Sequence, residues 1–269
     1  MSNNKPVILV TGSNGQLGNE LQQLAPAFTD YVFLFAAKDD LNIADEAAIE
    51  NYFSAHSINF CVNCAAYTAV DKAESETEQA FLMNATAVAI LATVCEKNNT
   101  QLIHISTDYV FDGKANKPYK ETDQTNPVSV YGKSKLQGEI LAIQNCPSAI
   151  IVRTAWLYSS FKNNFVKTIL RLMKEKESIN VVDDQFGCPT YAADLADAII
   201  QIIKSGKSKE NSSIYNYANT GTTTWYEFAV AIKNISGRSC IVNPISTSQY
   251  PTAAKRPAYS YQLVMPSFE

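Results

Sequence analysis

The stretch "VILVTGSNGQLG", residues 7–18, decides the fold of this chain. Its first five residues predict a buried strand, and the "NELQQLA" that directly follows the stretch predicts a helix. Between them, Gly12, Gly15 and Gly18 follow the spacing GxxGxxG. Glycines allow a tight turn and let backbone N–H groups approach a pyrophosphate, which the positive end of the helix dipole also attracts. This order of strand, glycine loop and helix predicts dinucleotide binding.

The first half of the chain repeats this alternation of strand and helix. Further apolar runs lie at 32–36, 60–65, 102–106 and 149–155, and helical periodicity covers 44–56 and 78–98. Continuous apolar strands joined by helices predict an α/β fold, a Rossmann-like, doubly wound parallel sheet. After about Trp156 the pattern loosens. We therefore expect a dinucleotide-binding domain over 1–156 and, over 157–269, mostly a smaller C-terminal substrate-binding lobe, from which some segments rejoin the first domain.

Composition excludes several functional classes. The 269 residues are 46% hydrophobic and 18% charged, an ordinary globular balance, and the net charge of −4 indicates no nucleic-acid or membrane partner. No apolar run looks long enough to span a bilayer, and "MSNNKPVILVTG" lacks the features of a signal peptide. Six scattered cysteines indicate free thiols in the reducing cytoplasm. A single CxxC, at Cys61 and Cys64, has no second ligand pair and predicts no zinc site.

A second stretch, "VYGKSK" at 130–135, carries candidate chemistry. On a helix, Tyr131 and Lys135 share a face, because they are four residues apart, whereas Lys133 points away. A carbonyl that receives a hydride needs a proton from a positioned acid. A nearby ammonium favours the phenolate, so we expect Lys135 to lower the pKa of Tyr131. The pair therefore predicts proton donation to a carbonyl, with Tyr131 as the acid.

Several further stretches carry a family resemblance: "ISTDYVFDG" (105–113), "RTAWLY" (153–158), "DDQFGCPT" (183–190) and "YPTAAKRPAYS" (250–260). With the glycine loop and "YGKSK", the chain resembles the extended short-chain dehydrogenases/reductases and, within them, the dTDP-4-dehydrorhamnose reductases. This resemblance implies NAD(P)H-dependent reduction of dTDP-4-dehydro-β-L-rhamnose to dTDP-L-rhamnose, the last step of dTDP-rhamnose biosynthesis. It runs from Val7 to about Ser260, and beyond Ser260 we expect a C-terminus that is truncated, shifted in frame or divergent.

The resemblance also implies roles for individual residues. The catalytic set is Tyr131, Lys135 and Thr107, with Thr107 holding the substrate carbonyl. The residues expected at the cofactor are Gly12, Ser13, Asn14, Gly15, Gln16, Leu17, Gly18, Lys38, Asn42, Ile43, Ala65, Ala66, Tyr67, Asn84, Tyr131 and Lys135. Those expected at the substrate are Thr107, Asp108, Tyr109 and Trp156, with Gln185 and Arg256 towards the diphosphate. Asn63 is expected beside the cofactor, and His104 is expected to be packed in its strand.

The choice between NADPH and NADH depends on where the second strand ends. Enzymes of this fold that use NAD place an acidic residue there, to bind the ribose 2′-hydroxyl. In "FLFAAKDD" that position falls on Ala37, and Lys38 follows, which favours NADPH while leaving NADH possible. If the strand runs two residues further, Asp39 takes the acid's place and the preference reverses.

Alternatives within the same family remain open. One is a sugar-nucleotide epimerase or dehydratase, and another is a non-catalytic regulatory homologue. The expected partner is a small nucleotide-sugar, and the expected state is a monomer or weak homodimer without metal. Some relatives dimerise around magnesium held by glutamates; Glu20 matches one such position, but Ala193 stands at the next. One carboxylate per chain is few for magnesium, which prefers several oxygen ligands.

Overall fold

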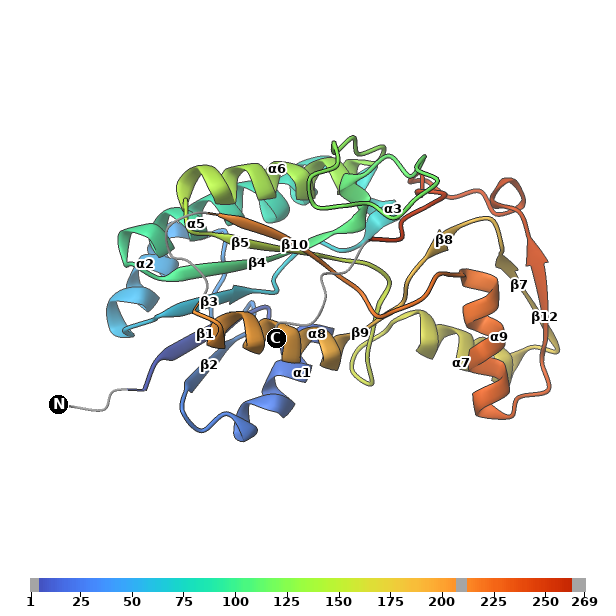
Figure 1. Ribbon diagram of the computed structural model, residues 1–269, viewed down its shortest axis with the longest axis horizontal. Helices are drawn as coiled ribbons and strands as arrows, with labels where there is room; N and C mark the ends of the chain where they lie inside the picture. Colours follow the sequence, from blue (N-terminus) through green and yellow to red (C-terminus); the bar gives the residue numbers. More distant parts are fainter. Residues whose placement is uncertain (1–4, 207–211, 263–269) are drawn as a thin grey trace.

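A six-stranded parallel sheet forms the centre of the computed structural model, which describes residues 5–206 and 212–262 (Figure 1). Its strands run in the order β10-β5-β4-β3-β1-β2. Their bounds are β1 (Val7–Thr11), β2 (Val32–Ala36), β3 (Phe60–Asn63), β4 (Gln101–Thr107), β5 (Ile150–Thr154) and β10 (Ser213–Tyr217). Because β2 lies on one side of β1 and the later strands on the other, the order switches between β1 and β3. Such a switch opens a crevice at the carboxyl ends of the strands.

Helices cover both faces of this sheet, which confirms the predicted doubly wound α/β fold. On one face lie α2 (Glu46–Ala55), α5 (Ala87–Lys97) and α6 (Val130–Asn145), and on the other α1 (Gln16–Leu24) and α8 (Ala192–Lys204). In β1, Leu9 packs in the core on the side of α2, α5 and α6, whereas Ile8 and Val10 pack in the core on the side of α1 and α8. Side chains alternate along a strand, so a sheet buried on both faces requires the continuous apolar runs seen in the sequence.

A separate cluster of elements, which we call the lobe, lies beyond one end of the sheet (Figure 1). It contains α7 (Phe165–Glu175), β7 (Ser178–Val182), α9 (Trp225–Ser236) and β12 (Ile241–Ile245), around a small apolar core of its own. Between these elements in the sequence, α8 and β10 return to the main sheet, where β10 pairs with β5. The chain thus leaves the first domain, re-enters it and leaves again.

Short elements join the two parts. The remaining strands are β6 (Leu157–Tyr158), β8 (Phe186–Gly187), β9 (Thr190–Tyr191) and β11 (Thr223–Thr224). Short helices also lie elsewhere in the described chain, among them η1 (Ala25–Ala27), α3 (Val70–Ala73), η3 (Asp108–Val110) and η4 (Thr247–Gln249). β6 pairs with β9, and β8 pairs with β11, so the segments that leave the sheet are held to those that return.

The helix expected at 78–98 is interrupted. It consists of α4 (Thr77–Phe81), a π-helical turn η2 (Leu82–Thr86) and α5. Gly138 of α6 lies so close to this turn that a Cβ at that position would overlap the carbonyl oxygen of Asn84. A π turn widens the helix by one residue and often marks a functional site. Here it brings the backbone of η2 against α6.

The run Thr77–Lys97 corrects one expectation from the sequence. By length and composition it could cross a membrane, although no apolar run was expected to be long enough. Half of its most apolar window is buried in the fold, and Val88 and Leu91 pack in the core under α2 and α6. In this structure the run is a core helix.

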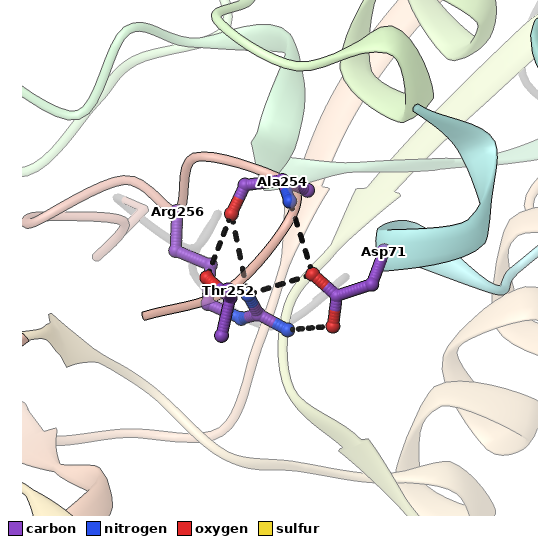
Figure 2. Close-up of polar contacts among 4 residues, drawn as sticks. All are labelled: Asp71, Thr252, Ala254 and Arg256. Carbon is purple, nitrogen blue, oxygen red and sulfur yellow. Dashed lines mark hydrogen bonds and ion pairs between the residues drawn. The ribbon is translucent and has the colours of Figure 1, made fainter. Parts of the chain in front are cut away.

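The segment 250–262 runs back from the lobe onto the first domain. Figure 2 shows its main side-chain attachment, in which Arg256 donates to both carboxylate oxygens of Asp71 on α3, at 3.1 and 2.7 Å. The backbone N–H of Ala254 also donates to Asp71, at 3.1 Å, and Thr252 donates to the carbonyl of Ala254. The hydrogen bonds of Arg256 lower the pKa of Asp71, so the carboxylate stays ionised at neutral pH. We call this contact the Asp71–Arg256 clamp.

Replacing Asp71 with asparagine should loosen segment 250–262 without unfolding the protein. The Asp71 side chain is 45% exposed, so solvent screens the pair and limits its worth to about 1 kcal/mol. We expect amide exchange of peptides within 250–262 to become up to about fivefold faster, measured by hydrogen–deuterium exchange. Lys97→Met, which removes the exposed pair with Glu50, is the control and should leave these peptides unchanged. Equal exchange in wild type and Asp71→Asn would show that the clamp does not hold the segment.

Candidate active site

A cavity of about 850 Å³ lies where the carboxyl ends of the sheet strands meet the lobe. Its walls come from the loops after β1, β4 and β5, from the start of α6, and from Phe165 and Trp225 of the lobe. Most of the residues expected at a cofactor or substrate line it: Gly12, Asn14, Gly15, Gln16, Leu17, Gly18, Lys38, Asn42, Ile43, Ala65, Ala66, Thr107, Asp108, Tyr109, Tyr131, Lys135 and Trp156. The fold therefore gathers into one cavity residues that are far apart in the sequence.

The glycine loop has the shape that a dinucleotide requires. Gly12 has a φ of +61°, and a Cβ at this position would lie 2.6 Å from the backbone nitrogen of Ala65. Only glycine fits that backbone conformation and that close approach. Helix α1 begins at Gln16, with Gly15 as its N-cap and no side chain capping the first turn. Its first backbone N–H groups thus remain available at the cavity, and these residues fit the pyrophosphate of a dinucleotide.

The end of β2 shows which residue stands at the position where NAD enzymes of this fold carry an acid. The strand ends at Ala36, and the next residue, Ala37, is buried and lines the cavity. Asp40 turns back and accepts a hydrogen bond from the N–H of Ala37 at 2.9 Å, while Lys38 lines the cavity. The strand does not run two residues further, so Asp39 does not take the acid's place.

Tyr131 and Thr107 meet at the cavity. Ser129 caps α6 by accepting from the N–H of Gly132 at 3.1 Å, which places Tyr131 in the first turn of the helix. The Thr107 hydroxyl lines the cavity beside Tyr131 and donates to Oδ1 of Asp108 at 3.0 Å, and the Tyr109 ring packs edge-on against the Tyr131 ring, with centroids 5.4 Å apart. Burial raises the pKa of Tyr131 to about 12, although the nearby Thr107 hydroxyl acts in the opposite direction. Tyr131 therefore keeps its proton at neutral pH, as a general acid must.

Lys135 lines the cavity with Tyr131, but its ammonium group also contacts β4, which the sequence did not predict. Its Nζ donates to the carbonyl oxygen of Ile105 at 2.6 Å and lies 3.4 Å from Nε2 of His104. The side chain is buried, and burial lowers the pKa of Lys135 to about 8, against an opposing effect of Glu139. The expected lowering of the Tyr131 pKa by this lysine is wrong for this arrangement, because burial raises the pKa of the phenol and the nearby Asp108 raises it further. Lys133 is exposed, as its spacing predicts.

A buried ion pair supports the helix behind Lys135. Glu139, one turn further along α6, accepts two hydrogen bonds from Arg153 of β5, at 2.9 and 2.7 Å. Ser106 of β4 donates to the same carboxylate at 2.5 Å. Both charged side chains are almost fully buried, at 3% and 2% exposure. The pair therefore joins α6 to the two strands beneath it and fixes the register of Tyr131 and Lys135 over β4.

Three residues expected at the cofactor lie outside the cavity lining. Ser13 is buried, and its N–H donates to the carbonyl of Ala36. Tyr67 points its hydroxyl to Glu76, at 2.6 Å. Asn84 is buried in the π turn, where its amide bonds the backbone of Tyr67 in both directions and donates to Ser134 at 3.0 Å. Asn84 thus braces the loop after β3 against α6.

Other expected residues have structural partners. Gln185 donates to Thr247 at 3.0 Å, and Arg256 belongs to the clamp; neither lines the cavity. The Glu20 carboxylate accepts a hydrogen bond from Ser159 at 2.7 Å and is buried, so it faces inward. Asn63 lies at the end of β3 and orients the N–H of Ala65 at 3.2 Å. Each of these side chains supports the fold around the cavity.

Asp108 and the tryptophans form the other side of the cavity. Burial raises the pKa of Asp108 to about 6, and within the described part of the chain its Oδ2 is buried without a hydrogen-bond partner. Trp156 adopts a φ of +47° and stacks on Trp225, with ring centroids 3.6 Å apart and planes 10° apart. Sequence reasoning missed Trp225. The available signal was the capping box of Thr224 and Glu227, which marks the start of α9.

Comparison with known proteins finds relatives that cover nearly the whole chain. A dTDP-4-dehydrorhamnose reductase from Aggregatibacter actinomycetemcomitans is 40% identical over 262 residues, covering 94% of this chain and 89% of the relative. A solved dTDP-4-dehydrorhamnose reductase from Bacillus anthracis, in complex with NADP, is 38% identical with a TM-score of 0.92 and covers 97% and 92% of the two chains. Another from Clostridium acetobutylicum is 40% identical, covers 96% and 90%, and has a TM-score of 0.91.

The family match extends over nearly the whole chain. The RmlD substrate binding domain family matches residues 6–266, so the resemblance continues past Ser260, where it was expected to end. The residues after Gln262 lie outside those that the structure describes. With a match of this length and relatives at this identity, the chain belongs to the RmlD substrate binding domain family.

Proposed function

We propose that this chain reduces dTDP-4-dehydro-β-L-rhamnose to dTDP-L-rhamnose with NADPH. The observation that carries the proposal is that Tyr131, at the start of α6, and Thr107, at the end of β4, line the same cavity as the glycine loop. The reductases to which the chain is similar support the choice of substrate, and the relative solved with NADP supports the choice of cofactor. The lobe of α7, β7, α9 and β12 is proposed as the substrate-binding part.

The chain's own residues would manage the proton. When bound, NADPH supplies the hydride that reaches the carbonyl carbon. Tyr131, which keeps its proton at neutral pH, donates it to the carbonyl oxygen, and Thr107 orients that oxygen through its hydroxyl. Lys135 lies in the same cavity and helps to return a proton to the phenolate. The first turn of α1 binds the pyrophosphate, and Lys38 pairs with the 2′-phosphate.

The opposite wall suits a deoxysugar. The buried Oδ2 atom of Asp108, which accepts no hydrogen bond from the described residues, fits a sugar hydroxyl, because a hydrogen bond there would satisfy it. Tyr109 and Trp156 line the cavity beside it with aromatic surface. Aromatic rings bind the apolar face of a sugar while their polar edges remain hydrogen-bonded.

The decisive assay is incubation with enzymatically made dTDP-4-dehydro-L-rhamnose while the absorbance of the reduced cofactor is followed. Stoichiometric loss of NADPH with formation of dTDP-L-rhamnose is the expected result. Co-purified NAD without net consumption of NADPH would instead indicate an epimerase or dehydratase. No turnover with a bound dinucleotide would indicate a regulatory homologue.

Replacing Ala37 with aspartate should weaken or invert the preference for NADPH. The new carboxylate would repel a 2′-phosphate and accept hydrogen bonds from a 2′-hydroxyl, at the end of β2 where NAD enzymes of this fold carry an acid. The measurement is the ratio of kcat/KM for the two cofactors in wild type and variant. Ala27→Asp, in the short helix η1 away from the cavity, is a matched charge control. A wild type that favours NADH would refute the role of Lys38.

We expect a metal-independent monomer or weak dimer. Glu20, the one carboxylate at a position where relatives bind magnesium, is already engaged by Ser159. EDTA should therefore leave both NADPH oxidation and the mass measured by light scattering unchanged. A dimer that dissociates in EDTA would refute this. The six free cysteines support a reducing compartment such as the cytoplasm.

A further inference from the structure

His104 is a buried titratable group that the proposed mechanism does not use. It lies on β4, fully buried, and does not line the cavity. Its two ring nitrogens face two different neighbours. Nδ1 lies 3.0 Å from the side-chain nitrogen of Asn63, and Nε2 lies 3.4 Å from Nζ of Lys135. A chain of polar contacts thus leads from the end of β3 to the lysine of the active site.

Asn63 determines which nitrogen of His104 carries the proton. The Oδ1 atom of Asn63 accepts from the backbone N–H of Ala65 at 3.2 Å and from the hydroxyl of Thr11 at 2.7 Å. A backbone N–H can only donate, so the amide oxygen must face it and the amide nitrogen must face His104. Nδ1 of His104 is then an acceptor. A neutral imidazole with an acceptor at Nδ1 carries its proton on Nε2.

Burial and the nearby Lys135 hold the pKa of His104 well below its ordinary value, so the ring is neutral. Its Nε2–H donor therefore points at Nζ of Lys135. An ammonium group has no lone pair to accept this donor, whereas an amine has one and can still donate to the carbonyl of Ile105. The contact thus opposes the charged form of the lysine.

The other titratable groups that face Lys135 do not cancel this effect. Glu139 favours the charged form, but its carboxylate already accepts two hydrogen bonds from Arg153. The pKa of the Cys64 thiol is raised by burial, so this group stays neutral. His104 is therefore the neighbour that presents a donor to the lysine nitrogen itself.

We propose that His104 is a positioning residue that acts through Lys135. Asn63 holds His104 in its Nε2–H tautomer, and this tautomer favours the amine form of the lysine. Lys135 can therefore release and regain a proton in each turnover. The proton leaves Nζ, reaches the phenolate oxygen of Tyr131, and is replaced on Nζ from solvent. When Nζ has lost its proton, its lone pair accepts the Nε2–H of His104. The catalytic part of this inference rests on the proposed function, whereas the tautomer and the lysine protonation do not.

The tautomer can be measured directly, because the chain has two histidines. In protein labelled with ¹⁵N-histidine, His56 is half-buried and serves as the internal reference. We expect His104 to show one protonated nitrogen, Nε2, and no titration from about pH 5 to 8. A proton on Nδ1 of His104, or titration of its ring within that range, would overturn the proposal.

The effect on the lysine can be measured without substrate by ¹³C NMR of labelled lysine ε-carbons, with the Lys135 signal assigned by its loss in Lys135→Met. In wild type we expect a midpoint of about 8. His104→Leu removes the donor without adding charge and should raise this midpoint by about one pH unit. Asn63→Asp should move the His104 proton to Nδ1 and raise the midpoint further. Thr11→Val is the matched control: it removes one hydrogen bond to Asn63 but leaves the Ala65 N–H that orients it, so tautomer and midpoint should not change.

The same variants test the catalytic part through the pH profile of kcat/KM. The fall of kcat/KM on the alkaline side should move to higher pH together with the lysine midpoint in His104→Leu. In Thr11→Val it should stay at the wild-type pH. A general loss of activity without this shift is the signature of a merely structural role and would overturn the proposal. Thermal unfolding checks that each variant is folded. If Asn63→Asp does not fold, an unchanged lysine midpoint in His104→Leu still refutes the inference.

Discussion

Replacing Tyr131 with phenylalanine should lower the rate of the chemical step by about two to four orders of magnitude, the usual scale for a positioned acid. The substitution removes the hydroxyl that is proposed to protonate the substrate oxygen. NADPH affinity should stay nearly intact, because the phenol does not belong to the loop that binds the pyrophosphate. Single-turnover absorbance would measure the rate, and a cofactor fluorescence titration would measure the affinity.

Two lysines of the same helix provide the matched comparison. Lys135→Ala should damage both turnover and cofactor affinity, because this lysine serves both. Lys133→Ala, an exposed residue two positions earlier, should change neither. Wild-type turnover in Tyr131→Phe would show that another group donates the proton, and the proposed mechanism would then be wrong.

The second large effect concerns stability. Glu139→Leu should lower the free energy of unfolding by about 3–5 kcal/mol, because it leaves the charge of Arg153 buried without a counter-charge. Ser106 would also lose its acceptor. Urea unfolding followed by circular dichroism would measure the change. The same variant should disturb the position of Tyr131, since α6 loses its buried ion pair with Arg153 of β5 and its hydrogen bond from Ser106 of β4.

A double variant separates the unpaired charge from lost packing. In Glu139→Leu with Arg153→Met, both charges are absent, and most of the lost stability should return. Arg171→Met breaks an exposed pair with Glu175 and should cost less than about 1 kcal/mol. If Glu139→Leu loses no more than this surface control, the buried pair does not support α6 as described.

The parts of the fold that could be predicted from sequence depend on nearby residues. The first strand and glycine loop were predictable because apolar runs and glycines act within a few residues. The shared face of Tyr131 and Lys135 followed from helical spacing. Long-range contacts were not predictable. The π turn at Asn84 depends on the approach of Gly138, which is 54 residues further along the chain.

The candidate site shows the same limit. The sequence places Lys135 beside Tyr131 on one helix. The groups that turn the lysine towards β4, the carbonyl of Ile105 and the ring of His104, belong to that strand and not to the helix. Trp225 enters the cavity only because the lobe packs there. A local pattern can identify the chemical groups of this site, whereas their orientation depends on contacts between distant segments.

The stacking of Trp156 on Trp225 gives this protein a built-in optical reporter. The chain contains two tryptophans, and both lie in the cavity. All of its indole absorption and emission therefore originates at the active site. Two parallel indoles at this separation couple their excited states, which produces a paired signal in circular dichroism. Any ligand that separates the rings would remove that signal, so occupancy of the cavity could be followed in the unmodified protein without a label.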